Sequence, residues 1–198
     1  MFITDSESCY TGVMIKAIVF DCFGVLTEDG WLAFTKKYAD ESVIDELKDI
    51  NRRADRGEVD YDTFLSTACS LTGAPKHVAH TMITAVHHPD EAVFAYIRQL
   101  KEAGYGLQVL SNVGSPLNQF LPKEYLALFD SQILSFEVGS LKPEPDIYWA
   151  GLARLAVEPN EAVFIDDRQG NVAGAEAVGM HGVVYLNVED LKVRLSAL

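Results

Sequence analysis

The sequence is poor in basic residues, with 16 lysines and arginines against 29 aspartates and glutamates, and its formal net charge is −13. Proteins whose main ligand is nucleic acid depend on clustered lysine and arginine to bind the phosphate backbone. The composition therefore argues against nucleic-acid binding as the main activity. We expect any anionic ligand to be bound by a few local cations instead.

Cysteines and long apolar runs are also scarce. The three cysteines, Cys9, Cys22 and Cys69, are odd in number and lack metal-like spacing, which fits a reducing compartment better than a disulfide framework. Apolar stretches such as 17–20 and 182–186 are far shorter than the roughly 20 residues that cross a bilayer. Residues 1–13 lack the basic leader and apolar segment of a signal peptide. We expect a cytoplasmic protein without a membrane partner, with 1–13 as an N-terminal arm.

Short β-branched runs alternate with helical patterns along most of the chain. A length of 198 residues and a hydrophobic content of 48% suit one domain with a modest insertion. Strands are predicted at 15–20, 106–110, 131–134, 162–165 and 182–186. Helices between them are predicted at 90–103, 145–156 and 171–178. This alternation predicts an α/β class fold, a Rossmann-like parallel sheet of about five strands with helices on both faces.

The interval 28–88 has a different character, because it contains helical patterns and no strand signal. Within it, Asp60 is expected to cap the start of a helix, and Gly73 is expected to end the same helix. The helical segments are predicted at 31–39, 42–54, 61–73 and 76–86. We therefore predict that an α-helical cap, 28–88, is inserted into an α/β core formed by 14–27 and 89–198.

Chemically versatile residues follow the predicted strands. In an open parallel sheet, ligands bind beyond the carboxyl ends of the strands, where the strand order reverses. The residues at these ends are Asp21, Cys22, Phe23 and Gly24 after the first strand, Ser111 and Asn112 after the second, Lys142 after the third, and Asp166, Asp167 and Asn171 after the fourth. We expect an acid, a hydroxyl, an ammonium group and an acidic pair to meet at one edge of the sheet.

Three of these residues, Asp21, Asp166 and Asp167, predict a metal site. Carboxylates that lie close together repel one another and are driven towards protonation unless a cation lies between them. Hard oxygen ligands favour Mg²⁺ over zinc. The expected cofactor is therefore Mg²⁺.

The order of these motifs resembles the haloacid dehalogenase-like hydrolase superfamily. The matching segments are "AIVFDCFGV", the strand that ends in Ser111-Asn112, Lys142-Pro143 before a helix, and "FIDDRQGN". The resemblance covers nearly the whole chain. It is strongest to phosphatase-like members with a helical cap, similar to bacterial sugar-phosphate phosphatases and to the N-terminal domain of epoxide hydrolase.

This resemblance implies a role for each motif. Asp21 would be the nucleophile that forms an aspartyl-phosphate, which water then hydrolyses. Mg²⁺ would be held by Asp21, the carbonyl of Phe23, Asp166 and Asp167, while Asn171 would orient the acidic pair. The groups implied in binding and stabilising phosphate are the backbone amides of the loop residues Cys22, Phe23 and Gly24 together with Ser111, Asn112 and Lys142. The expected function is a Mg²⁺-dependent, phosphatase-like hydrolase of a small phosphorylated metabolite, as a monomer or a homodimer.

Phe23 departs from the pattern of the superfamily. In most of its phosphatases this position holds a second aspartate that acts as general acid, and loss of such an acid typically costs about 10²–10⁴ in rate. Two alternatives therefore stay open: a 2-haloacid dehalogenase that uses Arg52, Arg53 or Arg56, and a non-catalytic module that binds phosphate or metal. The acidic pair favours phosphoryl chemistry, because the dehalogenases need no metal.

Overall fold

The computed structural model describes residues 14–84 and 89–198. The predicted arm at 1–13 and the last two residues of the helix predicted at 76–86 lie outside the described residues. Within the described ranges, no helix is both long enough and apolar enough to cross a membrane.

Five strands in the described part of the chain form one parallel sheet in the order β3-β2-β1-β4-β5. The strands are β1 (Ala17–Phe20), β2 (Gly106–Ser111), β3 (Ser131–Leu134), β4 (Ala162–Asp166) and β5 (His181–Val184). The predicted parallel sheet is confirmed, with ends that differ from the sequence prediction by one or two residues. The chain adds β2 and β3 on one side of β1 and then β4 and β5 on the other. The strand order therefore reverses at β1, where a ligand site is expected.

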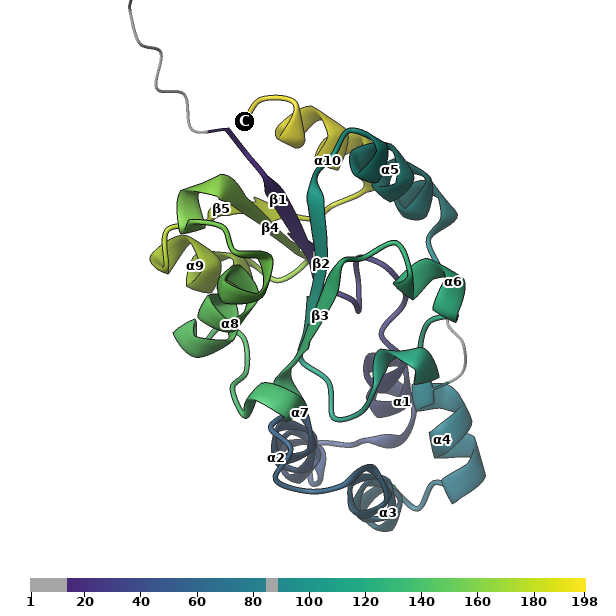
Figure 1. Cartoon of the computed structure of the whole chain (residues 1–198). Coiled ribbons are helices and arrows are strands. Elements are labelled where there is room, and N and C mark those ends of the chain that lie inside the picture. Colours follow the sequence, from purple (N-terminus) through teal and green to yellow (C-terminus); the bar gives the residue numbers. More distant parts are fainter. Residues whose placement is uncertain (1–13, 85–88) are drawn as a thin grey trace, which may run out of the picture.

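Helices cover both faces of the sheet (Figure 1). One face carries α5 (Glu91–Glu102) and α10 (Val188–Leu195), and the other carries α8 (Pro145–Leu155) and α9 (Gln169–Ala177). Because side chains alternate along a strand, Ile18 belongs to the hydrophobic cluster of α5, and Val19 belongs to the cluster of α8. The central strand is thus buried on both faces.

The sequence prediction missed α10 and several single helical turns. Only Leu191 is buried in α10, so the apolar periodicity of this helix is weak. The unpredicted turns are η1 (Leu117–Gln119), α6 (Lys123–Leu126), α7 (Ser135–Val138) and η2 (Pro159–Glu161). A single turn is too short to produce a periodic signal.

The region between β1 and α5 is helical, as predicted. It contains α1 (Gly30–Tyr38), α2 (Ile44–Asp55), α3 (Tyr61–Thr72) and α4 (Lys76–Thr84), which lie together at the lower end of the molecule in Figure 1. The carboxylate of Asp60 accepts a hydrogen bond from the Thr63 amide at 2.7 Å and caps α3. Gly73, with φ of 69°, ends that helix. Both predicted helix signals are confirmed.

The end of α2 lies directly against the backbone of the core. A Cβ atom on Gly114, in the loop after β2, would lie 2.9 Å from the carbonyl carbon and oxygen of Ala54. A Cβ atom on Gly57, where φ is +76°, would lie 2.5 Å from the carbonyl oxygen of Phe136. Two glycines therefore allow a close backbone contact between the cap and the core.

We predict that Gly114→Ala destabilises the protein by about 1–3 kcal/mol, because the added methyl group must push α2 away from the loop after β2. The matched control is Gly170→Ala, in α9, where an added Cβ meets nothing within 4 Å. That change should be neutral or stabilising by up to about 1 kcal/mol. Urea unfolding of both variants measures the two effects, and equal stability of the two would contradict the proposed close contact.

Candidate active site

Asp21 and Lys142 form a buried ion pair at the carboxyl ends of the strands. Asp21 directly follows β1, and its amide donates a hydrogen bond to the Ile165 carbonyl of β4 at 2.8 Å. The Lys142 ammonium lies 2.6 Å from Oδ1 of Asp21 and 2.7 Å from Oδ2 of Asp166. All three side chains are almost completely buried. The ammonium therefore links the end of β1 to the end of β4.

A carboxylate cluster lies beside this lysine. Oxygen atoms of Asp21, Asp166 and Asp167 all lie within 4.8 Å of one another. Gly24 has φ of +87°, and a Cβ atom there would lie 2.6 Å from Oδ2 of Asp167, so only glycine fits between the β1 loop and this carboxylate. A set of hard oxygen donors at this spacing fits Mg²⁺. The three carboxylates predicted from the sequence as metal ligands are thus brought together; the Phe23 carbonyl stays a predicted ligand.

Asp166 is held in one orientation from several sides. The side-chain amide of Asn171, in α9, donates to both carboxylate oxygens of Asp166 at 3.0 Å. The Arg168 amide donates to Oδ1 at 2.8 Å, and Lys142 donates to Oδ2. Asn171 therefore lies where a residue that orients the acidic pair is expected.

The electrostatics of the cluster reflect an excess of negative charge. The pKa of Asp21 is raised to about 7, mainly by burial; Lys142 opposes this shift, and the negative charge of Asp166 adds to it. Burial also raises the pKa of Asp167, with Asp166 as the next cause. Burial lowers the pKa of Lys142, but Asp21 and Asp166 raise it more, so this pKa lies above its ordinary value. One ammonium does not balance three carboxylates, and a divalent cation would supply the missing charge.

Ser111 presents a buried polar atom without a partner. Its Oγ atom is fully buried at the end of β2 and has no hydrogen-bond partner among the described residues. Buried hydroxyl groups are nearly always hydrogen-bonded in native proteins. A phosphoryl oxygen bound at the end of the strands would satisfy this group, which is the role expected for Ser111.

The loop after β1 offers fewer free amides than the sequence led us to expect. The Cys22 amide donates to Oδ1 of Asp21 at 2.6 Å, and the Gly24 amide donates to the Thr27 carbonyl at 2.7 Å. Within the described part of the chain, the Phe23 amide makes no hydrogen bond. Of these three amides, that of Phe23 is available to a ligand.

Asn112 holds the loop that carries Lys142. Its side-chain nitrogen donates to the Lys142 carbonyl at 3.0 Å, and its side-chain oxygen accepts from the Lys142 amide at 2.8 Å. The structure therefore gives Asn112 a positioning contact. Its expected contact with phosphate stays a prediction.

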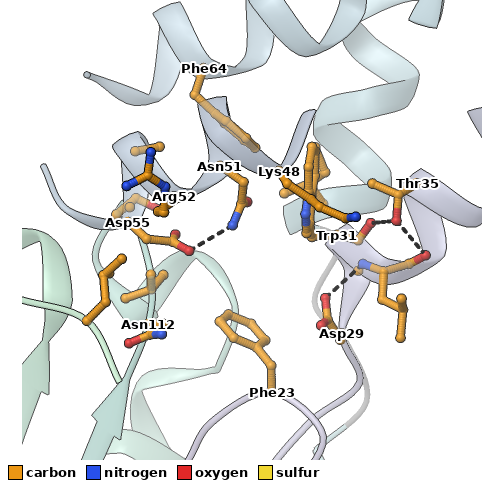
Figure 2. Close-up of a pocket in the computed structure, with 18 of the residues that line it drawn as sticks. Phe23, Asp29, Trp31, Thr35, Lys48, Asn51, Arg52, Asp55, Phe64 and Asn112 are labelled. Carbon is orange, nitrogen blue, oxygen red and sulfur yellow. Dashed lines mark hydrogen bonds between the residues drawn. The ribbon is translucent and has the colours of Figure 1, made fainter. Parts of the chain in front are cut away.

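A cavity of about 540 Å³ opens above these groups, between the core and the cap. Asp21, Asn112 and Lys142 line it from the core. Its apolar wall contains Phe23, Trp31 and Phe64, and Figure 2 shows Phe23 facing the cap helices across the open space. The rings of Trp31 and Phe64 lie 5.1 Å apart. The cavity therefore combines a charged floor with aromatic walls.

Four charged residues that line this cavity were not singled out from the sequence: Asp29, Lys48, Asp55 and Arg168. Asp29 accepts a hydrogen bond from the Leu32 amide at 2.9 Å and caps α1, which is a signal that the sequence offered. Asp55 lies in a highly charged part of α2, and such a pattern is typical of a solvated helix face. No local signal distinguishes it.

The three arginines considered for dehalogenase chemistry have different surroundings. Arg52 lines the cavity and pairs with Asp49 at 2.6 Å. Arg53 lies 3.5 Å from Glu58, and Arg56 forms hydrogen bonds with Glu144. Of the three, Arg52 is the one positioned to meet a ligand in this cavity.

Comparison with known proteins identifies the family. Residues 15–179 match the sequence model of the haloacid dehalogenase-like hydrolases. A sesquiterpene phosphatase from Aspergillus oryzae, astK, is 29% identical over 181 residues, which cover 85% of this chain and 88% of that protein. A glyceraldehyde 3-phosphate phosphatase from Methanopyrus kandleri is 26% identical over 196 residues, with 84% and 82% covered.

A solved structure gives the same fold. The crystal structure of a haloacid dehalogenase family enzyme from Bacteroides thetaiotaomicron, in complex with magnesium and inorganic phosphate, matches with a TM-score of 0.69 and 21% identity. The match covers 89% of this chain and 98% of that chain. The resemblance inferred from the motifs is confirmed. The chain belongs to the haloacid dehalogenase-like hydrolase family.

Proposed function

We propose that this hydrolase is a Mg²⁺-dependent phosphatase that acts on a small phosphorylated metabolite through an aspartyl-phosphate on Asp21. The observation that carries the proposal is the position of Asp21 at the floor of the cavity, in contact with the Lys142 ammonium and close to the carboxylates of Asp166 and Asp167. The names of the two phosphatase relatives and the magnesium and phosphate bound to the structural neighbour support it.

The residues of the site suit displacement at phosphorus. An oxygen of Asp21 attacks the phosphorus atom, the bond to the leaving oxygen breaks, and water later hydrolyses the acyl phosphate. Lys142 and the Ser111 hydroxyl stabilise the negative charge on the phosphoryl oxygens. Asp21, Asp166 and Asp167 would hold Mg²⁺, with the Phe23 carbonyl as a further ligand. When bound, the ion offsets the repulsion between the carboxylate and the anionic substrate.

The walls of the cavity favour a substrate with an apolar or ring-shaped part. Phe23, Trp31 and Phe64 offer apolar surface, while Lys48 and Arg52 add positive charge on the cap side. Aromatic side chains contribute much of the binding energy for such ligands. We also propose that the core consists of 14–27 and 89–198 and that the cap consists of 28–88. The protein is proposed to be a monomer or a homodimer.

Dehalogenation is the second candidate, because Arg52 lines the cavity and the aromatic Phe23 replaces an acid. A halide leaves without a proton, so this chemistry needs no general acid. The carboxylate cluster argues against it, since the two acids beside the nucleophile, Asp166 and Asp167, fit a metal site. Chloride release from 2-chloropropionate in the presence of EDTA would favour the dehalogenase over the phosphatase.

We predict that Asp21→Asn abolishes Mg²⁺-dependent hydrolysis of p-nitrophenyl phosphate, because the amide is not a nucleophile towards phosphorus. The leaving group of this substrate needs little protonation, so the wild-type protein should hydrolyse it despite Phe23. Steady-state rates with Mg²⁺ and with EDTA measure the effect, and the melting temperature shows that the variant is folded. Activity that survives in the variant would exclude Asp21 as the nucleophile.

We also predict that Mg²⁺ raises the melting temperature of EDTA-treated protein, since a ligand that binds only the folded state stabilises it by about 2.7 kcal/mol at a concentration of 100 Kd. Asp167→Asn removes one charged ligand and should shift this response to higher Mg²⁺ concentrations. The control is Asp62→Asn on the surface of α3, which should respond like the wild type. Equal titrations of the wild type and Asp167→Asn would show that the cluster does not bind the ion.

A further inference from the structure

The cavity contains a carboxyl group that the proposed mechanism has not used. Among the described residues that line the cavity, the carboxylates are Asp21, Asp29 and Asp55. Asp21 is the proposed nucleophile. Asp29 caps α1 through Oδ1, and its Oδ2 atom lies 3.3 Å from the Arg168 guanidinium. Both oxygens therefore act as acceptors, as in an ionised carboxylate. Asp55 is therefore the lining carboxylate without an assigned role, and Phe23 occupies the position where most phosphatases of this family carry their acid.

Asp55 lies at the end of α2 and lines the cavity from the cap side. Figure 2 shows its carboxylate pointing into the space above Phe23 and Asn112. The side-chain amide of Asn51, one turn earlier in α2, donates to Oδ2 of Asp55 at 2.8 Å. In the described part of the chain, no other side-chain hydrogen bond holds this carboxyl group. Its second oxygen is therefore available to a ligand.

The backbone of Asp55 is fixed to the core. The hydroxyl group of Ser135 donates to the Asp55 carbonyl at 2.6 Å, and the Ser135 Oγ atom accepts a hydrogen bond from the Val113 amide at 2.9 Å. Val113 directly follows Asn112, in the loop where Gly114 touches the backbone of Ala54. The end of α2 is thus attached to the loop that follows β2.

A second attachment joins the same end of α2 to the loop that carries Lys142. The Arg56 guanidinium forms two hydrogen bonds with the carboxylate of Glu144, one of them at 3.2 Å. Glu144 in turn accepts from Ser140 Oγ at 3.0 Å and from the Leu141 amide at 3.1 Å. Asp55 therefore has a fixed position relative to the nucleophile, as a catalytic group requires.

The surroundings of Asp55 favour its protonated form. Its pKa is raised to about 7, mainly by burial, and the negative charge of the nearby Asp29 acts in the same direction. The hydrogen bond from Asn51 opposes the shift, as do the positive charges of Arg168 and Lys142. A carboxyl group with a pKa close to neutral can both donate a proton and accept one.

We propose that Asp55, a residue of the cap, is the general acid and base of this enzyme and replaces the aspartate absent at position 23. The inference rests on the proposed phosphatase function. As Asp21 bonds to phosphorus and the ester bond breaks, the proton of Asp55 moves to the leaving oxygen. The Asp55 carboxylate then takes a proton from the water whose oxygen bonds to phosphorus, and the bond from phosphorus to Asp21 breaks.

The first test compares Asp55→Asn with the wild type on two substrates, glycerol 2-phosphate and p-nitrophenyl phosphate, with Mg²⁺ present. The value of kcat/KM reports the steps up to departure of the leaving group, so it isolates the acid role. We expect about a 100-fold loss on the alkyl ester, whose leaving oxygen needs a proton, and less than about a 3-fold loss on the aryl ester. Equal losses on both would assign Asp55 a structural role and overturn the proposal.

The control is Glu46→Gln, an exposed carboxylate-to-amide change on the same helix, which should keep both activities. Asp55→Asn is nearly isosteric, and urea unfolding shows whether it is folded. If the wild-type protein hydrolyses neither ester with Mg²⁺ present, this result would contradict the proposed phosphatase function itself. A wild-type phosphatase that Asp55→Asn leaves unchanged on both esters would overturn only the role of Asp55.

The pH profile gives a second readout. If protonated Asp55 donates the proton, kcat/KM of the wild type on glycerol 2-phosphate falls as the pH rises through about 7. This fall should be absent in Asp55→Asn. Charged groups facing Asp55 from other elements are Asp29, Lys142 and Arg168, and the variant leaves all three in place. An unchanged alkaline limb in the variant would exclude Asp55 as the acid.

Restoring the usual acid provides a rescue experiment. Adding Phe23→Asp to Asp55→Asn should raise kcat/KM on glycerol 2-phosphate by about 10-fold or more, and should change p-nitrophenyl phosphate hydrolysis little. A gain in kcat/KM on the alkyl ester alone would show that Asp55→Asn lacks a proton donor, as the proposal requires. The same gain on both esters would contradict it.

Discussion

The buried contact of Lys142 with Asp21 and Asp166 is the interaction on which the rest of the site depends. The Lys142 ammonium lies 2.6 Å from the Asp21 carboxylate and 2.7 Å from the Asp166 carboxylate where the strand order reverses, and all three groups are nearly inaccessible to water. Leaving one charge of such a group unpaired costs about 3–5 kcal/mol. The ends of β1 and β4 and the loop before α8 must therefore keep their relative positions. Asn112 and Asn171 support this arrangement by holding the Lys142 loop and the Asp166 carboxylate.

The cap and the core divide the work of the site. In the proposed function, the core supplies the nucleophile, the metal ligands and the charges that bind phosphate, and the helices between β1 and β2 supply aromatic walls. The junction is rigid where the chemistry needs it, because Gly57 and Gly114 allow close backbone contact and Arg56 pairs with Glu144. A cap attached in this way can provide a reacting group as well as a cover. The proposed role of Asp55 follows from that rigidity.

Most of the fold could be predicted from the sequence because its signals are local. Short β-branched runs identified the strands, period-3.6 apolar patterns identified the long helices, and Asp60 and Gly73 marked the ends of α3 correctly. The helix α10 was missed because it buries a single leucine, and the single turns were missed because one turn has no period. The sequence led us to expect that three loop amides bind phosphate, but those of Cys22 and Gly24 form hydrogen bonds within the protein.

The sequence by itself determined the order in which the strands and helices follow one another along the chain. It also determined which acid, hydroxyl, ammonium group and acidic pair meet at the strand ends, because parallel strands place their carboxyl ends at one edge. Tertiary structure alone decided which other charges reach the cavity. Asp55 belongs to a charged stretch of helix with no local distinction, and Arg52 and Arg53 are neighbours that face different surroundings. A helix pattern fixes which residues share a face. What that face meets depends on contacts between segments far apart in the chain.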